Sequence, residues 1–270
     1  MSPSVPRIET LTAPASWRTL DFISDLHLQA DEPATVAAWQ AYMQGTQASA
    51  LFILGDLFEV WVGDDAIDAI ADAAAPAPGS FEAQCCAMLR ATAQRLPVYF
   101  MRGNRDFLVG QGFAQHCGTT ALADPTVLVF TGQRVLLSHG DLLCLDDVDY
   151  QRFRQQAHEP AWQQRFLAQP LPARRAQARS MRAHSEARKQ SGAWYADVDE
   201  AAARQWLRAA QARTLIHGHT HRPADHRLEP EGQRVVLSDW DMAAQPPRAE
   251  VLRLTAAGLA RIALAADAPA

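Results

Sequence analysis

The sequence lacks the features that mark disulfide-rich secreted proteins and membrane-spanning proteins. Its 270 residues contain four cysteines, none in a C-x-x-C pair, so we expect reduced thiols and a cytoplasmic setting. No apolar run approaches the ~18 residues that cross a bilayer. The first sixteen residues lack the charged and apolar segments of a signal peptide. We therefore expect a protein that meets a membrane only from its surface.

An excess of positive charge is also missing from the chain as a whole. The formal net charge is −5, so we expect no nucleic-acid partner, and no feature calls for an obligate protein partner. Hydrophobic residues make up 48% of the chain and charged residues 20%, as in ordinary globular proteins with a sizeable core. We interpret residues 1–17 as an extension without fixed structure and residues 18–270 as one domain.

Short apolar segments alternate with helical segments in the first half of the chain. We expect strands over residues 20–25, 50–56 and 98–101. Helices over 33–48 and 80–95 separate them. Later strands are expected over 127–130 and 134–138, which form a hairpin, and then over 215–216, 235–238, 249–254 and 259–264. This order predicts an α/β fold with an antiparallel tail.

Aspartate, histidine and asparagine follow five of the expected strands. The stretches are Asp25-Leu26-His27, Gly55-Asp56, Gly103-Asn104, His139-Gly140-Asp141 and His217-Gly218-His219. Alternate residues of an extended segment face the same side, so His217 and His219 can aim at one point. A core hydrogen bond explains one histidine, but it explains the run of His217, His219 and His221 poorly. The pattern predicts a metal site.

The residue types restrict the metal and its use. No thiolate is present among them, which favours Mn²⁺, Fe²⁺ or Zn²⁺ in an open catalytic site over a closed structural zinc site. Seven side chains are too many for one ion that must also hold a substrate. They suit two ions that share one bridging carboxylate, an arrangement that polarises phosphoryl oxygens.

Five sequence blocks resemble those of a known enzyme family. F-I-S-D-L-H, L-G-D-L-F-E, G-N-R-D, S-H-G-D and H-G-H-T-H look like the metal-binding blocks of the calcineurin-like metallophosphoesterases. The longer blocks L-G-D-L-F-E-V-W-V-G-D-D, R-G-N-R-D-F-L, H-G-D-L-L-C-L-D-D-V-D-Y and I-H-G-H-T-H-R-P resemble, within them, the UDP-2,3-diacylglucosamine diphosphatases of lipid A biosynthesis. They extend from about residue 21 to about residue 242.

The resemblance implies a fold and a reaction. The fold would be a four-layer αββα sandwich of two mixed sheets, with a helical lid inserted over about 145–200. The reaction would be hydrolysis of the diphosphate of UDP-2,3-diacylglucosamine to UMP and 2,3-diacylglucosamine 1-phosphate (lipid X). The cofactor would be two divalent ions, most simply Mn²⁺. The protein would work as a peripheral protein at the cytoplasmic side of the inner membrane.

The same resemblance implies roles for individual residues. One ion would be held by Asp25, His27, Asp56 and His219, and the second by Asp56, Asn104, His139 and His217. His221 would orient a neighbouring ligand. The catalytic residues would be Asp56, which bridges the ions, and Arg105. The substrate would be bound by Asn104, Arg105, Asp147, Ser185, Lys189 and His217. Arg188 and Ser191 compete with Lys189 for its role, and Tyr150 and Arg182 are further candidates.

Arg105 bears on the kind of bond that is cleaved. It stands in G-N-R-D, where many metallophosphoesterases have histidine. An arginine does not donate its proton usefully, but it binds phosphate oxygens and stabilises developing negative charge. A phosphate leaving group hardly needs a proton, so Arg105 favours diphosphate cleavage over hydrolysis of a simple monoester. The alternative is a solvated arginine in a turn.

The segment 150–190 carries nine basic and two acidic residues, a net charge of +7. It also contains Phe153, Trp162 and Phe166. This composition predicts an amphipathic lid that clamps phosphate or uridine, or lies on acyl chains or an anionic membrane. The lipid-linked UDP-sugar is thus the expected partner. The alternative is a solvated helical face that packs on the core.

An acidic run is interpreted as a solvated face; its residues are Glu59, Asp64, Asp65, Asp68 and Asp72. Two other functions remain open. The protein could be a metallophosphoesterase for a nucleotide or another phosphodiester, or a non-catalytic metal-dependent scaffold. The basic, apolar insertion favours the lipid substrate over the first. The complete ligand set and Arg105 argue against the second.

Overall fold

The computed structural model describes residues 5–68, 79–190, 196–230 and 232–264, with only the backbone described over 182–190. The strands are β1 (Glu9–Thr12), β2 (Thr19–Ile23), β3 (Ala50–Leu54), β4 (Val98–Met101), β5 (Thr120–Leu122), β6 (Thr126–Phe130), β7 (Gln133–Leu137), β8 (Thr214–His217), β9 (Ala224–Arg227), β10 (Gln233–Val236), β11 (Glu250–Thr255) and β12 (Gly258–Ala263). The α-helices are α1 (Pro33–Gly45), α2 (Phe81–Ala93), α3 (Gln111–Cys117), α4 (Val148–Ala157), α5 (Pro160–Leu167), α6 (Leu171–Gln190) and α7 (Glu200–Ala210).

The strands form two six-stranded sheets. The first, here the β2 sheet, has the order β12-β11-β2-β3-β4-β5, and the second, the β8 sheet, has the order β1-β6-β7-β8-β10-β9. In the β2 sheet, β2, β3, β4 and β5 pair in parallel. Strand β11 pairs antiparallel with β2, and β12 pairs antiparallel with β11. The β8 sheet also combines parallel and antiparallel pairs. The expected α/β fold with two mixed sheets is confirmed.

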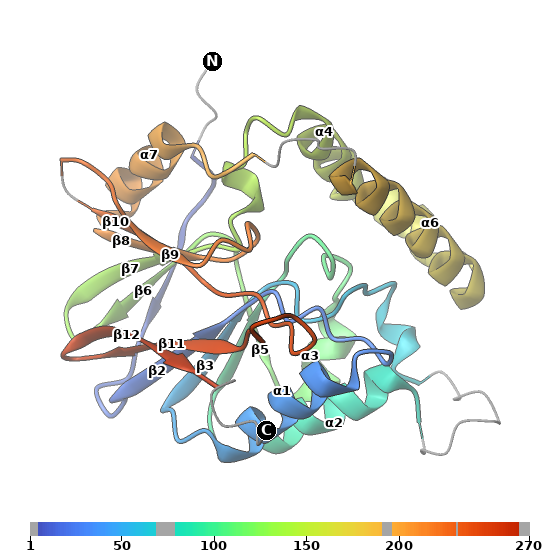
Figure 1. The fold of residues 1–270 in the computed structure, drawn as a ribbon, viewed down its shortest axis with the longest axis horizontal. Helices are drawn as coiled ribbons and strands as arrows, with labels where there is room; N and C mark the ends of the chain where they lie inside the picture. Colours follow the sequence, from blue (N-terminus) through green and yellow to red (C-terminus); the bar gives the residue numbers. More distant parts are fainter. Residues whose placement is uncertain (1–4, 69–78, 191–195, 231, 265–270) are drawn as a thin grey trace.

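Three apolar cores hold four layers together. The inner faces of the two sheets pack on each other through residues such as Phe52, Leu128 and Ile216. The outer face of the β2 sheet packs on α1 and α2 around Trp39, and the outer face of the β8 sheet packs on α7 around Trp206. Figure 1 shows α1 and α2 on one side of the two sheets and α7 on the other.

The register of the parallel strands brings their carboxyl ends to one level. Ile23 of β2 pairs with Ile53 of β3, and Leu54 of β3 pairs with Met101 of β4. In the other sheet, Leu137 of β7 pairs with Ile216 of β8. The loops that follow these strands therefore leave the two sheets beside one another, which is where α/β folds place binding sites.

The prediction that residues 1–17 form an extension without fixed structure is partly wrong. Residues 9–12 form β1, which pairs in parallel with β6 from Glu9↔Thr126 onward, and Trp17 is buried. The pairing partner lies more than a hundred residues away, so the local pattern gives no sign of it. Residues 1–4 lie outside the described part of the chain. Helix α3 and strands β5 and β9 were not predicted either.

The segment expected to be an insertion contains α4, α5 and α6. Pro160 is the first residue of α5, where its missing N–H is tolerated, and Pro170 directly precedes α6. Figure 1 shows α4 and α6 together at one side of the molecule. Among the described residues, no helix is long and apolar enough to cross a membrane.

Candidate metal centre

The loops after β2 and β3 place three potential metal ligands on strained backbone. Asp25 and His27 follow β2, Asp56 follows β3, and the two aspartates are buried. Their φ angles are 55°, 49° and 53°, in the left-handed region that residues other than glycine rarely adopt. Such strain persists where surrounding contacts fix it, and it is typical of functional sites.

One group of donors surrounds Asp25. The Nε2 atoms of His27 and His221 lie 3.1 Å apart, and Nε2 of His221 lies 3.5 Å from Oδ1 of Asp25. Ligand atoms of these three residues all fall within 4.8 Å of one another, close enough to hold one ion. The group joins the loop after β2 to the loop after β8.

A second group of donors surrounds Asn104. Its Oδ1 atom lies 2.9 Å from Nε2 of His139 and 2.7 Å from Nδ1 of His219. Nε2 of His139 is also 3.7 Å from Oδ1 of Asp56. Ligand atoms of Asp25, Asp56 and His139 again lie within 4.8 Å of one another, so Asp56 lies with the second group and Asp25 lies near both. Carboxylates in such positions can connect two ions.

The electrostatics of this region favour a cation. Burial lowers the pKa of His139, but the carboxylates of Asp56, Asp25 and Asp141 outweigh burial and raise it to about 9. The carboxylates therefore hold a positive charge at His139 in the absence of an ion. Divalent ions would supply that charge and displace the proton, since a metal binds neutral imidazole. The oxygen and nitrogen donors present fit two borderline divalent ions.

The prediction that His217 binds the second ion is wrong. His217 is fully buried at the end of β8, and its Nδ1–H donates to the carbonyl of Gly218 at 2.8 Å. Its Nε2 atom lies 3.4 Å from Nη1 of Arg234, a permanent cation that opposes a metal ion at the same nitrogen. His217 neither joins the two donor groups nor lines the cavity next to them. Its predicted role in binding the substrate is therefore wrong as well.

The two histidines that reach the donor groups are His219 and His221. Alternation predicts that His217 and His219 share a side, but β8 ends at His217 and the chain then turns. His219 and His221 have φ angles of 68° and 51°. Because these left-handed residues break the extended geometry, His219 lies against Asn104 and His221 against Asp25 and His27. His221 thus takes the place assigned to His219, and His219 the place assigned to His217.

Carboxylates and carbonyls behind the histidines fix their rings. Nδ1 of His139 lies 2.9 Å from the carbonyl oxygen of Leu54, and Nδ1 of His27 lies 2.8 Å from Oε2 of Glu59. Such partners set the tautomer and leave the other ring nitrogen for the metal. Glu59 was interpreted as part of a solvated acidic run, but only 7% of its surface is exposed. Its spacing of three residues from Asp56 was the only sequence signal.

Asp106 was also missed, and it fixes the backbone of the centre. Its buried carboxylate accepts the N–H groups of Gly103 at 2.7 Å, Leu57 at 2.8 Å and Asp56 at 3.3 Å. In return, Oδ1 of Asp56 accepts the N–H of Arg105 at 2.8 Å. The loops after β3 and β4 are therefore connected in both directions.

A large cavity opens from the two donor groups. Its volume is about 1010 Å³, at the upper end of the range for small-molecule sites. The polar end is lined by His27, Asp56, Asn104, Arg105, His219 and His221. The remaining wall is largely apolar, with Val60, Trp61, Phe107, Phe153, Trp162 and Phe166. The last three come from α4 and α5.

The other predicted substrate residues divide into two groups. Arg105 and Asp147 line the cavity, and Asp147 also caps α4 by accepting the N–H of Tyr150 at 3.1 Å. Ser185 and Lys189 belong to α6, but their side chains lie outside the described part of the structure. The competing candidates Arg182, Arg188 and Ser191 are outside it too.

Tyr150 and Arg154 connect α4 to the centre. Tyr150 lines the cavity, its ring lies 5.7 Å from that of His219, and its hydroxyl donates to Asp141. Arg154 also donates to Asp141, with its Nε atom at 2.6 Å from the carboxylate. The first helix of the insertion is therefore fixed to the same loop that carries His139.

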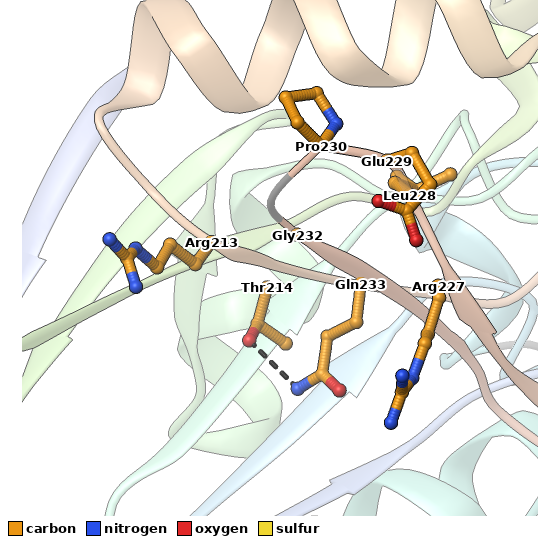
Figure 2. A pocket seen from close by; sticks show the side chains of 8 residues that line it. All are labelled: Arg213, Thr214, Arg227, Leu228, Glu229, Pro230, Gly232 and Gln233. Carbon is orange, nitrogen blue, oxygen red and sulfur yellow. Dashed lines mark hydrogen bonds between the residues drawn. The ribbon is translucent and has the colours of Figure 1, made fainter.

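A second, smaller cavity of about 320 Å³ lies elsewhere, at the start of β8 and β10. Figure 2 shows two of its lining residues, Thr214 and Gln233, which are joined by a 3.0 Å hydrogen bond, and Arg213 and Arg227, which extend away from each other. The start of β8 is the end opposite His217. None of the potential metal ligands lines this cavity.

The fold and both donor groups agree with a known enzyme family. The family model of the calcineurin-like phosphoesterases matches residues 18–223, about three quarters of the chain. The chain belongs to the calcineurin-like phosphoesterase family. Phosphoesterases of this family are metal-dependent hydrolases, which agrees with the expectation of a hydrolytic enzyme and not of a scaffold.

Two relatives of this phosphoesterase are similar over most of their length. A protein of Chromobacterium violaceum named UDP-2,3-diacylglucosamine hydrolase is 49% identical over 230 residues, covering 82% of this chain and 90% of its own. A protein of the same name from Xanthomonas campestris pv. campestris is 45% identical, covering 88% of this chain and 96% of its own.

Among solved structures, a novel archaeal phosphodiesterase is similar to this phosphoesterase with a TM-score of 0.45. The two sequences are 9% identical, and the match covers 91% of this chain and 99% of the other.

Proposed function

We propose that this phosphoesterase hydrolyses the diphosphate of UDP-2,3-diacylglucosamine and releases UMP and 2,3-diacylglucosamine 1-phosphate, a step of lipid A biosynthesis. One observation carries the proposal: a single cavity joins the two donor groups to a long apolar wall from the inserted helices. A small polar phosphoester has no use for that wall. The relatives named UDP-2,3-diacylglucosamine hydrolase agree with a substrate that has a diphosphate at one end and acyl chains at the other.

The side chains that would hold the ions follow from the two donor groups. One ion would take Asp25, His27, Asp56 and His221, and the other Asp56, Asn104, His139 and His219. When bound, two such ions neutralise phosphoryl charge and provide a nucleophilic water at neutral pH. Mn²⁺ is the ion that we propose, because the donors are carboxylate, imidazole and amide oxygen without thiolate.

The residues of the chain itself would orient the diphosphate. Arg105 stands at the polar end of the cavity with its backbone fixed to Asp56, so its guanidinium can bind phosphate oxygens and stabilise charge on the leaving phosphate. The apolar wall excludes water and receives the acyl chains. Asp147 lies at the cavity edge, where it can accept hydrogen bonds from the sugar or base. Ser185 and Lys189 remain proposals from the family resemblance.

We also propose peripheral association with the cytoplasmic face of the inner membrane. The substrate has two acyl chains, so it must be taken from a lipid surface. On the inserted helices, Val148 and Leu167 are exposed by 51% and 40%, unusual values among the large apolar side chains that the structure describes. Exposed basic residues lie on the same helices, such as Arg152 on α4 and Arg165 on α5, although the immediate neighbours of Val148 are Asp147 and Asp149. Apolar contact combined with positive charge is the usual basis of binding to anionic membranes.

The test is hydrolysis of the proposed substrate. Purified protein is incubated with UDP-2,3-diacylglucosamine and Mn²⁺, and UMP release is measured beside the Asp56→Ala variant. Metal-dependent release that the variant loses supports the proposal. If a simple phosphodiester is cleaved and UDP-2,3-diacylglucosamine is not, the metal centre stands and the lipid substrate is wrong.

A further inference from the structure

Glu59 lies at the junction of the two functional parts of the site. It ends the block L-G-D-L-F-E, three residues after Asp56, and lines the polar end of the large cavity. Its backbone N–H donates to the carbonyl of Leu28 at 3.2 Å, beside a parallel bridge between Leu28 and Phe58. The backbone of Glu59 is therefore fixed relative to the loop that carries His27.

The two carboxylate oxygens of Glu59 face different residues. Oε2 lies 2.8 Å from Nδ1 of His27, and Oε1 lies 3.5 Å from Nη1 of Arg105. The three side chains are 9%, 14% and 16% exposed, so solvent screens these contacts little. A carboxylate this deeply buried is costly unless it is paired, and His27 and Arg105 provide the pairing.

The contact with His27 decides which ring nitrogen is available to an ion. The negative charge of Oε2 at 2.8 Å favours a proton on Nδ1, which leaves the lone pair of the neutral ring on Nε2. Nε2 is the atom that faces His221, next to Asp25. The partner on the outer nitrogen also holds the ring in the plane that ligation needs.

The contact with Arg105 limits where its guanidinium points. The backbone of Arg105 is fixed twice, since its N–H donates to Asp56 at 2.8 Å and its carbonyl accepts the N–H of Trp61 at 3.0 Å. An arginine side chain is long and has many rotamers available to it. The opposite charge on Glu59 favours those that keep the guanidinium at the polar end of the cavity.

We propose that Glu59 is a positioning residue that serves two groups with one carboxylate: it orients His27 toward an ion and Arg105 toward the phosphate. The second half rests on the proposed function, because it assumes that Arg105 meets a phosphate there. The first half needs only a divalent ion at Asp25, His27 and His221.

The first experiment measures Mn²⁺ binding by calorimetric titration, without substrate. Glu59→Ala should weaken the binding at one site by about 10–100-fold, as expected when a ligand loses its outer partner. Glu59→Gln should stay within about threefold of the wild type, since it keeps an oxygen beside Nδ1 of His27. Asp68→Asn is the matched control, because it removes an exposed carboxylate from the same acidic run. Equal Mn²⁺ binding by Glu59→Ala and the wild type would overturn the first half, and so would an equal loss in Asp68→Asn.

The second experiment is a kinetic double-mutant cycle on UMP release. Glu59→Gln should lower kcat/KM by about 10-fold, an estimate from the typical cost of misplacing a charge-stabilising group. In the Arg105→Ala background the same substitution should change kcat/KM by less than about twofold, since the residue through which it acts is gone. Equal losses in both backgrounds would overturn the second half.

The two experiments separate this inference from the proposed function. If the wild type binds Mn²⁺ but releases no UMP, the lipid substrate is wrong and the titration still tests the link between Glu59 and His27. If the wild type releases UMP and both Glu59 variants match it in binding and turnover, the inference fails and the proposed function stands. Because Glu59→Gln keeps the size and shape of the side chain, its loss of turnover cannot be assigned to unfolding while its Mn²⁺ binding is intact.

Discussion

Several ligands of the metal centre have an energetically unfavourable backbone conformation. Asp25, His27, Asp56, His219 and His221 all have positive φ. Each left-handed residue costs roughly 1 kcal/mol, so together they cost about 5 kcal/mol, a large part of a typical folding free energy. The loops keep this backbone because hydrogen bonds such as those to Asp106 fix it. The strain is concentrated where the donors must converge.

Substitution of His221 should affect metal binding, whereas substitution of His217 should affect stability. His221→Ala should weaken Mn²⁺ binding at one site by at least about 100-fold, more than the 10–100-fold typical of losing an outer partner. His217→Ala should keep Mn²⁺ binding within about threefold, but lower the free energy of unfolding by about 1–3 kcal/mol, because Arg234 and Gly218 lose a buried hydrogen-bond partner. Calorimetric titration and urea unfolding measure the two effects. If His217→Ala loses Mn²⁺ binding and His221→Ala keeps it, the prediction from the sequence that His217 binds an ion would be right.

The limits of the sequence are also visible at this scale. The residue types Asp, His and Asn after apolar strands predicted that Asp25, His27, Asp56, Asn104 and His139 lie close together, and the structure brings them together. The choice among the three histidines after β8 failed because alternation assumes extended backbone. The left-handed turn that follows β8 depends on contacts such as the N–H of His219 with the carboxylate of Asp25, 194 residues away.

Among the elements, helix α6 is held in place by a buried arginine. Arg174 of α6 is 2% exposed, and its guanidinium donates to the carbonyls of Val62 and Gln169 and to the carboxylate of Asp65. A Cβ atom on Gly63, whose φ is 134°, would lie 2.3 Å from Nη1 of Arg174. The close approach of the loop before Asp64 to α6 therefore requires glycine.

Removal of the arginine should loosen α6 without unfolding the sheets. Arg174→Ala leaves the carbonyl of Val62 and the side chain of Asp65 without this partner, at a cost of about 1–3 kcal/mol. We expect limited proteolysis to cut within 160–190 several times faster than in the wild type. Arg165→Ala, on α5, is the matched control for the loss of one positive charge. Equal cleavage rates for Arg174→Ala and the wild type would contradict this account of α6.

A second ion pair lies where the chain returns from the insertion. Arg234 of β10 is 3% exposed and donates to Asp197 at 2.8 Å. Burial raises the pKa of Asp197, but hydrogen bonds from Arg234 and from the N–H of Val198 outweigh burial, so the pKa lies below its ordinary value. The folded state then binds fewer protons than the unfolded state near pH 4.

The stability that Asp197 contributes should therefore disappear in acid. It is present above the unfolded pKa of about 3.9 and is lost as pH falls through the lower folded pKa. Asp197→Asn should lower the free energy of unfolding at pH 7, because Arg234 loses its ion-pair partner. The expected loss is only about 1–2 kcal/mol, since Asp197 is partly exposed, and it should shrink below pH 4. Urea unfolding in EDTA measures it, with the exposed Asp149→Asn as control. A difference that stays constant down to pH 3 would contradict the assignment.

The strands also differ in how well their own sequences predict them. β3 and β4 were predicted because they are continuous apolar runs that are buried in the sheet. β9 has the polar sequence A-D-H-R and lies at a sheet edge, where its pairing with β10 and not its own composition makes it a strand. β1 is a second edge strand of this kind, with the sequence E-T-L-T.

For the whole molecule, the centre adds to two other kinds of contact between the sheets. One is apolar packing, and the other is Arg261 of β12, which donates to Asp225 of β9 and to the carbonyl of Val236 of β10. The loops of the β2 sheet contribute Asp25, His27, Asp56 and Asn104, and those of the β8 sheet contribute His139, His219 and His221. Each ion would therefore have ligands from both sheets. Metal binding should stabilise the native state as a unit, because the unfolded chain has no such arrangement of donors.

Removal of the ions should accordingly lower the melting temperature. At a free Mn²⁺ concentration about 100 times Kd, binding at one site stabilises by about 2.7 kcal/mol. For a domain of this size that corresponds to a rise in Tm of about 5–10 °C over protein in EDTA. Scanning calorimetry at several Mn²⁺ concentrations measures the rise. His221→Ala should show a smaller rise, and a Tm that does not depend on Mn²⁺ in the wild type would contradict a centre shared between the sheets.

The pairing of β2 with β11 has a consequence during translation. Phe22 lies opposite Leu252, and the fully buried carboxylate of Asp21 has its ion-pair partner in Arg253, at 2.8 Å. At ribosomal rates of about 5–20 residues per second, about 230 residues of synthesis separate the two strands by on the order of 10–50 s. Throughout that interval the nascent β2 keeps one unpaired edge and an unneutralised carboxylate. The β2 sheet can therefore be completed only after almost the whole chain has left the ribosome.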